Sequence, residues 1–147
     1  MVLGKDSLYS GKIVIEFKVE SFPEHVKLFL DFEGLSVKDM YVNDQKVKDS
    51  DLVMSHGRIL LPYRYLISNG INKVSLKFEN EYVQNSAGLH KFVDPVDQKS
   101  YFYTHLEPFF CHRWFPCFDQ PSIRAPLKMT VVTPVADWNV YSNDIIK

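Results

Sequence analysis

The sequence lacks the features that mark several large classes of protein. It has two cysteines in 147 residues, no Asn-x-Ser/Thr acceptor for N-linked glycans, and a formal net charge of −1. Two cysteines cannot form the disulfide framework of a small secreted domain. The balanced charge lacks the basic patch of a nucleic-acid-binding protein. No apolar run reaches the roughly 18 residues that a transmembrane helix needs. We therefore expect neither nucleic acid nor a membrane as a partner.

The first residues also lack the apolar stretch of a secretory signal. Together with the low cysteine count, this predicts a reducing, cytoplasmic location. Hydrophobic residues make up 46% of the chain, which is typical of a globular protein. The length suits one domain over residues 1–147.

Short segments of alternating polarity predict strands. In residues 12–19 apolar side chains occupy every second position, which is the period of a strand with one buried face. Asn43-Asp44 suits a tight hairpin turn, and a helical turn is suggested only at residues 63–68. Further strands are predicted at residues 26–32, 39–42, 45–47, 58–61 and 74–78. Regular short strands of this kind indicate an all-β fold, as an antiparallel β-sandwich or a saddle-like curved sheet.

The remainder of the chain is less regular. Residues 79–99 are polar, contain Gly88 and Pro95, and show no clean periodicity. We expect a long ordered loop there, and loops of this length are often functional. Strands are predicted again at residues 101–106, 127–132 and 139–141.

Residues 101–126 concentrate aromatics, prolines and both cysteines. Cys111, His112 and Cys117 invite comparison with a metal site, but Cys-His-x4-Cys is not a standard zinc spacing and no fourth ligand is evident. We therefore expect no metal ligand in the chain. A disulfide between the two cysteines is equally disfavoured in a reducing compartment. A structural turn fits better, with Asp119 accepting backbone hydrogen bonds and Arg113 pairing with an acid such as Asp119 or with a neighbouring domain.

A longer pattern in the same segment matches a known family. Tyr101, Tyr103, Thr104, Glu107 and Pro108 fit a strand that reads Tyr-x-Tyr-Thr-Gln-x-Glu-Pro. An Arg-x-Phe-Pro-Cys-Phe-Asp-Gln-Pro turn follows, and upstream lies a Gly-Leu-His-Lys-Phe-Val-Asp-Pro segment that begins at Gly88. In these motifs the chain resembles the N-terminal β domain of the aminopeptidase N family of zinc aminopeptidases. Weaker matches around Tyr9 and Trp138 extend the resemblance over nearly the whole chain.

The resemblance implies a parent enzyme that uses zinc to remove N-terminal residues from peptides. The zinc site itself is missing, because none of the five histidines lies in an H-E-x-x-H motif. The family's Gly-x-Met-Glu-Asn loop is missing too. We therefore expect a partial domain that is inactive alone and has the catalytic zinc domain of the parent as its partner. We expect no room here for the family's strand before Tyr9 or for its sheet after Asn143.

The resemblance also implies two substrate-binding residues. The Glu of the family's Glu-Pro pair holds the free α-ammonium group of the peptide substrate, which assigns that role to Glu107. His105 stands where the family has an amide, and we expect it to share a strand face with Glu107 and to line the pocket for the first substrate side chain. The alternatives are an exposed carboxylate at a strand edge for Glu107 and a half-buried, locally hydrogen-bonded histidine for His105.

A second reading of the whole chain belongs to a different class. The sequence also fits a non-catalytic β-sandwich interaction module that has kept the fold and lost the catalytic domain. An H-E-x-x-H motif in frame after Lys147 would favour the enzyme, and a stop codon would favour the module.

Overall fold

The computed structural model of the chain describes residues 1–4, 7–22 and 26–143. Its regular structure in these ranges consists of strands and three single-turn 3-10 helices. The strands are β1 (Val2–Leu3), β2 (Leu8–Val19), β3 (Phe29–Asp31), β4 (Ser36–Val42), β5 (Gln45–Lys46), β6 (Met54–Ser55), β7 (Arg58–Leu60), β8 (Gly70–Glu81), β9 (Gly88–Val93) and β10 (Ser100–His105). The helices are η1 (Asp49–Asp51), η2 (Tyr63–Tyr65) and η3 (Cys111–Arg113). The helical turn expected within residues 63–68 is therefore confirmed as η2.

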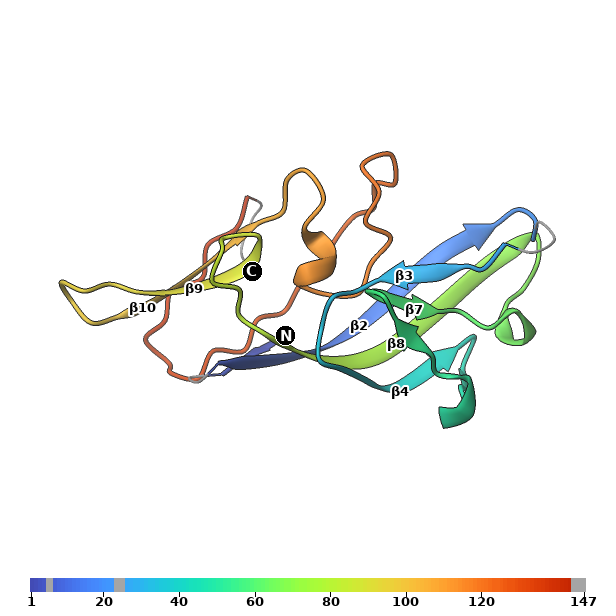
Figure 1. Cartoon of the computed structure of the whole chain (residues 1–147), viewed down its shortest axis with the longest axis horizontal. Helices are drawn as coiled ribbons and strands as arrows, with labels where there is room; N and C mark the ends of the chain where they lie inside the picture. The colour runs from blue at the N-terminus through green and yellow to red at the C-terminus, as the bar shows by residue number, and fades with distance from the viewer. Residues whose placement is uncertain (5–6, 23–25, 144–147) are drawn as a thin grey trace.

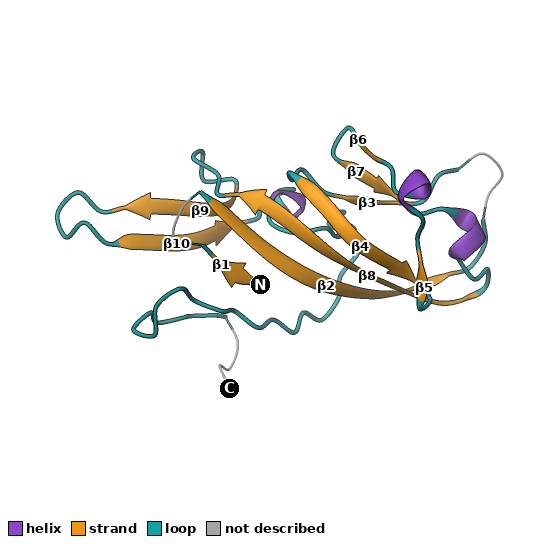
Figure 2. Ribbon diagram, turned by 90° about the horizontal axis from the view of Figure 1, so that it is seen from below, coloured by secondary structure: helices purple, strands orange, loops and turns teal. Residues whose placement is uncertain are grey.

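The largest sheet has five strands in the order β1-β2-β8-β4-β5, and each neighbouring pair is antiparallel. β2 and β8 are 12 residues long and pair over their whole length, which gives the long curved ribbon in Figure 2. Period-two alternation buries one face of β8. The buried members of that face are Asn72, Val74, Leu76, Phe78 and Asn80.

A second, three-stranded sheet in the order β3-β7-β6 packs against this face. Figure 1 shows β3 and β7 beside β8 and β4. Phe32, just after β3, meets Phe78 of β8 edge to face with ring centroids 5.6 Å apart, a geometry that aromatic rings favour. The core between the sheets also contains Leu30, Met40, Val42, Val47, Ile59, Leu61, Val74 and Leu76. The predicted all-β, antiparallel fold is confirmed.

The hairpin between β4 and β5 carries the turn chemistry that the sequence predicts. Tyr41 pairs with Lys46 and Val42 with Gln45, so Asn43 and Asp44 form a two-residue loop. Their φ angles are 50° and 64°, as a turn that matches the right-handed twist of its strands requires.

The long loop expected over residues 79–99 is wrong. β8 continues to Glu81, and β9 occupies Gly88–Val93. Asn80 and His90 are buried polar residues of these strands, and such residues disguise a strand because they break the apolar alternation. The loops are limited to residues 82–87 and 94–99.

Two predicted strands near the end of the described chain are also wrong. Residues 127–132 contain only one β-bridge, from Val132 to Val2 of β1, and residues 139–141 are coil. A strand forms through hydrogen bonds to a neighbouring strand, and here the neighbour, β1, is two residues long. The expectation that no strand precedes Tyr9 is wrong as well. β1 precedes Tyr9 and pairs with β2.

β9 and β10 form a separate two-stranded hairpin that extends beyond the two sheets (Figure 1). Its register runs from Ser100 opposite Val93 to His105 opposite Gly88. Leu89 at the base of β9 belongs to the main core cluster. The hairpin is therefore anchored at one end, and the chain leaves that end toward η3.

Candidate functional site

Glu107 lies just beyond the end of β10, in the turn that leads to η3. The backbone N–H of Phe110 donates to the carbonyl of Leu106 at 3.0 Å and closes this turn, and the peptide between Glu107 and Pro108 is cis. The Glu107 side chain is exposed. Among the residues that the structure describes, none makes a hydrogen bond or ion pair with its carboxylate. Both oxygens are therefore available to a donor from outside the chain.

His105 is the last residue of β10 and is exposed. The expectation that it shares a strand face with Glu107 is wrong, because the strand ends between them. The half-buried alternative for His105 does not hold either. Its ring lies 6.2 Å from the ring of Phe110 between centroids, so the turn places an aromatic side chain beside it.

The turn that follows is held by a buried histidine. His112 in η3 donates its backbone N–H to Asp119 Oδ2 at 2.9 Å, and its Nδ1 lies 2.6 Å from the same oxygen. Asp119 therefore accepts a backbone hydrogen bond within the turn, as predicted. Arg113 does not pair with Asp119; its Nε donates to Glu33 Oε2 at 2.9 Å. His112 contacts Asp119 Oδ2, whereas the Glu33 carboxylate lies within hydrogen-bond distance of the Arg113 guanidinium.

The turn is tied to the five-stranded sheet by two buried polar side chains. The hydroxyl of Tyr9 in β2 donates to the carbonyl of Trp114 at 2.7 Å. The amide of Asn80 in β8 donates to the carbonyls of Arg113 at 2.9 Å and Glu33 at 3.1 Å. Burial raises the pKa of Tyr9 above its ordinary value, because the charged form is poorly solvated there. The hydroxyl therefore stays protonated and remains a donor.

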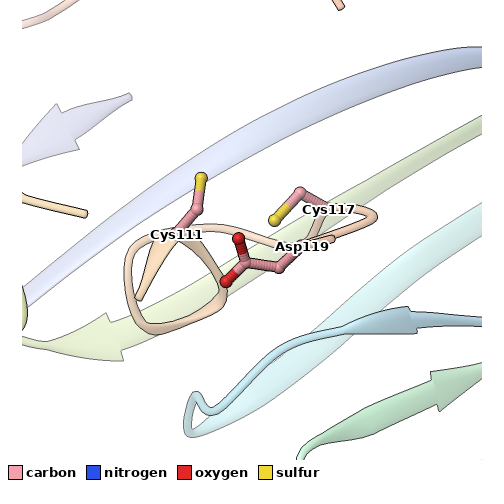
Figure 3. Close-up of side chains that lie close together, drawn as sticks. All are labelled: Cys111, Cys117 and Asp119. Carbon is pink, nitrogen blue, oxygen red and sulfur yellow. The ribbon is translucent and has the colours of Figure 1, made fainter. Parts of the chain in front are cut away.

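The same turn brings both thiols to one carboxylate. Cys111 Sγ, Cys117 Sγ and an oxygen of Asp119 all lie within 4.8 Å of one another (Figure 3). Both cysteines are free and half-buried. The pKa of Cys117 is raised above its ordinary value, first by its hydrogen bond with Cys111, then by burial and by the nearby acids Asp119 and Asp31. The Cys-His-x4-Cys spacing did not predict Asp119 as a neighbour of the thiols, although Asp119 stands two residues after Cys117.

The residues described do not fit the catalytic zinc of the family that the motifs resemble. In residues 1–4, 7–22 and 26–143, the only group of three or more His, Cys, Asp or Glu donors at metal-binding distance is Cys111, Cys117 and Asp119. It contains no histidine and lies on no helix that could carry H-E-x-x-H. No step of zinc-dependent hydrolysis can be assigned to these side chains.

In residues 1–4, 7–22 and 26–143, no helix has the length and apolarity needed to cross a bilayer.

Comparison with known proteins agrees with the motif pattern. The family described as Peptidase M1 N-terminal domain matches residues 2–146. Aminopeptidase N of Streptomyces lividans is 34% identical over 115 residues, which are 78% of this chain and 13% of that protein. Probable aminopeptidase 1 of Sulfurisphaera tokodaii is 27% identical over 123 residues, 84% of this chain and 14% of that protein.

The fold is found in a solved structure as well. Native leukotriene A4 hydrolase from Saccharomyces cerevisiae superposes with a TM-score of 0.68 at 18% identity, over 90% of this chain and 22% of that one. At this identity the likeness concerns the fold alone. The chain spans about one seventh or less of the curated relatives named above. Because the family matches nearly the whole of this chain, the chain belongs to the peptidase M1 family as an N-terminal domain.

Proposed function

We propose that this domain is the substrate-amine-recognition part of a zinc-dependent aminopeptidase that removes N-terminal residues from peptides. Membership of the M1 family supports the reaction class. The zinc ligands would come from the parent's catalytic domain, since the described part of this chain offers no matching donor set.

The exposed Glu107 carboxylate is the observation that carries the proposal. It has no hydrogen-bond or ion-pair partner in the described part of the chain, and it lies at the end of an anchored hairpin. A free α-ammonium group offers three N–H donors, and charge-assisted hydrogen bonds to a carboxylate are among the strongest in proteins. A peptide with a blocked N-terminus would lose this contact, which explains selectivity for N-terminal residues.

His105 would line the pocket for the first substrate side chain. Its exposure at the end of β10 leaves the imidazole open to a ligand. The adjacent ring of Phe110 adds apolar surface. Mixed surfaces of this kind, with one polar group among apolar atoms, are typical of specificity pockets.

The catalytic domain would dock on the β9–β10 hairpin and the turn after it. Large apolar side chains are exposed there, and a group of exposed apolar side chains often marks a protein–protein interface. They are Phe92, Val93, Val96, Tyr101, Tyr103 and Phe109. Covering them would also desolvate the surroundings of Glu107 and strengthen its contact with the substrate amine.

A cytoplasmic location is part of the proposal. Two half-buried cysteines remain free thiols although their donor atoms lie within 4.8 Å. A thiol pair at this distance persists most readily in a reducing compartment.

The proposal is tested by kinetics on the full-length protein that contains this domain. Glu107→Gln keeps the shape of the side chain and removes its charge. If the contact is worth roughly 2–5 kcal/mol, kcat/KM for peptides with a free N-terminus should fall by roughly 30-fold to several thousand-fold. Glu16→Gln is the matched control, because Glu16 is an exposed glutamate on β2.

Two outcomes would overturn the proposal. One is a Glu107→Gln variant with kcat and KM equal to those of the control. The other is a full-length protein with no H-E-x-x-H motif and no aminopeptidase activity, which would favour the non-catalytic interaction module.

A further inference from the structure

We propose that Cys111, Cys117 and Asp119 form a binding site for a thiophilic divalent cation, with zinc as the best chemical fit. The Cys-His-x4-Cys spacing lacks a further ligand in the sequence, and the fold supplies one in the Asp119 carboxylate. Two thiolates and one carboxylate are ordinary zinc donors. The inference is independent of the role proposed for Glu107.

The distances suit one small ion. In tetrahedral coordination with Zn–S bonds of about 2.3 Å, two sulfur ligands lie roughly 3.8 Å apart. The three donor atoms here are within 4.8 Å of one another. Small side-chain rotations would bring them to coordination distance, and the fourth position would remain open to water.

Both cysteines are held by their backbones. Cys117 exchanges two hydrogen bonds with Asp31 at the edge of β3, N–H to carbonyl at 3.1 Å and carbonyl to N–H at 2.8 Å. Cys111 begins η3, and its carbonyl accepts from the N–H groups of Trp114 at 2.9 Å and Phe115 at 3.1 Å. Because both backbones are fixed, little conformational entropy remains to be lost when an ion binds.

The carboxylate is oriented in the way that metal ligands usually are. His112 approaches Asp119 Oδ2 with its backbone N–H and with Nδ1. Outer partners of this kind fix a ligand's direction and raise metal affinity. Within the described residues no hydrogen bond engages Asp119 Oδ1, so one oxygen is left for an ion.

The local charge also favours a cation. Asp31 lies beside the site, where its Oδ2 accepts from the N–H of Asp119 at 3.2 Å. Arg58 approaches the other oxygen of Asp31 at 3.8 Å, and the Arg58 side chain is largely exposed. The two carboxylates, Asp31 and Asp119, and the two thiols therefore lie together, and the exposed Arg58 offsets only part of their negative charge.

The test uses the 147-residue chain, purified free of metal and reduced with a phosphine rather than a thiol. Cobalt(II) serves as a spectroscopic substitute for zinc, because thiolate ligands give it intense charge-transfer absorption. We expect this absorption to saturate at one equivalent and zinc to displace the cobalt. Zinc should also protect both cysteines from alkylation by iodoacetamide.

Variants separate the assigned site from binding elsewhere. Cys117→Ser and Cys111→Ser should abolish the charge-transfer band, and Asp119→Asn should weaken binding. His112→Gln should lower zinc affinity by roughly 10–100-fold, the usual effect of removing a partner that orients a ligand. Asp44→Asn is the control for Asp119→Asn, since Asp44 is exposed in a turn, and it should bind zinc as the parent chain does.

Three results would overturn the inference. The first is the absence of thiolate-to-cobalt absorption in the reduced parent chain. The second is zinc binding that survives the double replacement of Cys111 and Cys117 by serine. The third is alkylation of the parent chain at the same rate with and without zinc, a measurement that needs no variant to fold. None of these depends on aminopeptidase activity.

Discussion

Asn80 offers a sharp test of how the turn after Glu107 is attached to the sheet. Its amide donates to the carbonyls of Glu33 and Arg113, and its Oδ1 accepts from the N–H of Glu81 at 2.8 Å. Asn80 is 6% exposed. At a net 0.5–1.5 kcal/mol for each hydrogen bond, Asn80→Ala should lower the free energy of unfolding by about 1.5–4.5 kcal/mol. Arg113 would retain one partner, because the Tyr9 hydroxyl also approaches its carbonyl, at 3.2 Å.

Asn80→Asp should be worse than Asn80→Ala at neutral pH, although it is closer in shape. The introduced carboxylate would face two carbonyl oxygens and would be buried without a donor from either. Burial beside these oxygens raises its pKa in the folded state. The deficit is therefore fully present at neutral pH, and it diminishes as the pH falls and the carboxyl becomes protonated and can donate again.

Urea unfolding followed by tryptophan fluorescence measures both variants, since Trp114 lies beside the tied carbonyls and is buried. Asn85→Asp is the control, because Asn85 is exposed and its side-chain oxygen accepts from the N–H of Ala87, a role that aspartate can keep. The control should stay within about 0.5 kcal/mol of the parent chain. An Asn80→Asp variant as stable as the control at neutral pH would refute the reasoning.

Three further predictions concern other parts of the chain. Gly34→Ala should lower the free energy of unfolding by about 1–3 kcal/mol, because a Cβ there would overlap the ring of Phe32, which is fully buried; unchanged stability in a urea titration would contradict this. Tyr101→Phe should raise the pKa of Asp97, which is held below its ordinary value first by the N–H of Lys99 and then by the Tyr101 hydroxyl. Because the pKa of Asp97 is lowered in the folded state, its carboxylate stabilises the fold at pH values above the ordinary pKa of aspartate, and this stabilisation is lost as the pH falls. NMR titration of Tyr101→Phe should show the raised pKa of Asp97, and an unchanged pKa would contradict the contact. The purified 147-residue chain should not hydrolyse aminoacyl amides, and chelator-sensitive turnover by it would contradict the assignment of catalysis to another domain.

Regular strands could be predicted because their alternation is local. β2 and the apolar half of β8 are visible in the sequence, and Asn43-Asp44 marks the hairpin between β4 and β5 through the φ angles that it tolerates. The end of β8 and all of β9 were hidden because their buried positions include Asn80 and His90. Side-chain hydrogen bonds to distant segments allow Asn80 to be buried, and a window of sequence does not contain them.

Strands that depend on a distant partner were predicted least well. The alternation of residues 127–132 predicted a strand, but only Val132 forms a β-bridge, because the neighbouring β1 is two residues long. Whether an apolar segment becomes a strand is decided by what lies beside it.

The candidate site shows the same division between local and distant information. Motif resemblance singled out Glu107 and His105, and the structure adds that both are exposed at the end of the hairpin. The convergence of Asp119 with Cys111 and Cys117 arises from the path of the chain through η3 and the turn after it. The pairing of Arg113 with Glu33 spans 80 residues and had no local signal.

Recognition of the substrate amine by Glu107 is the central claim, and one measurement tests it most directly. In the full-length protein, the inhibition constant of a non-hydrolysable peptide analogue with a free α-amine is compared with that of its desamino counterpart. The parent protein should prefer the amine, and Glu107→Gln should lose most of that preference while Glu16→Gln keeps it. An equal preference for the amine in all three proteins would contradict the account.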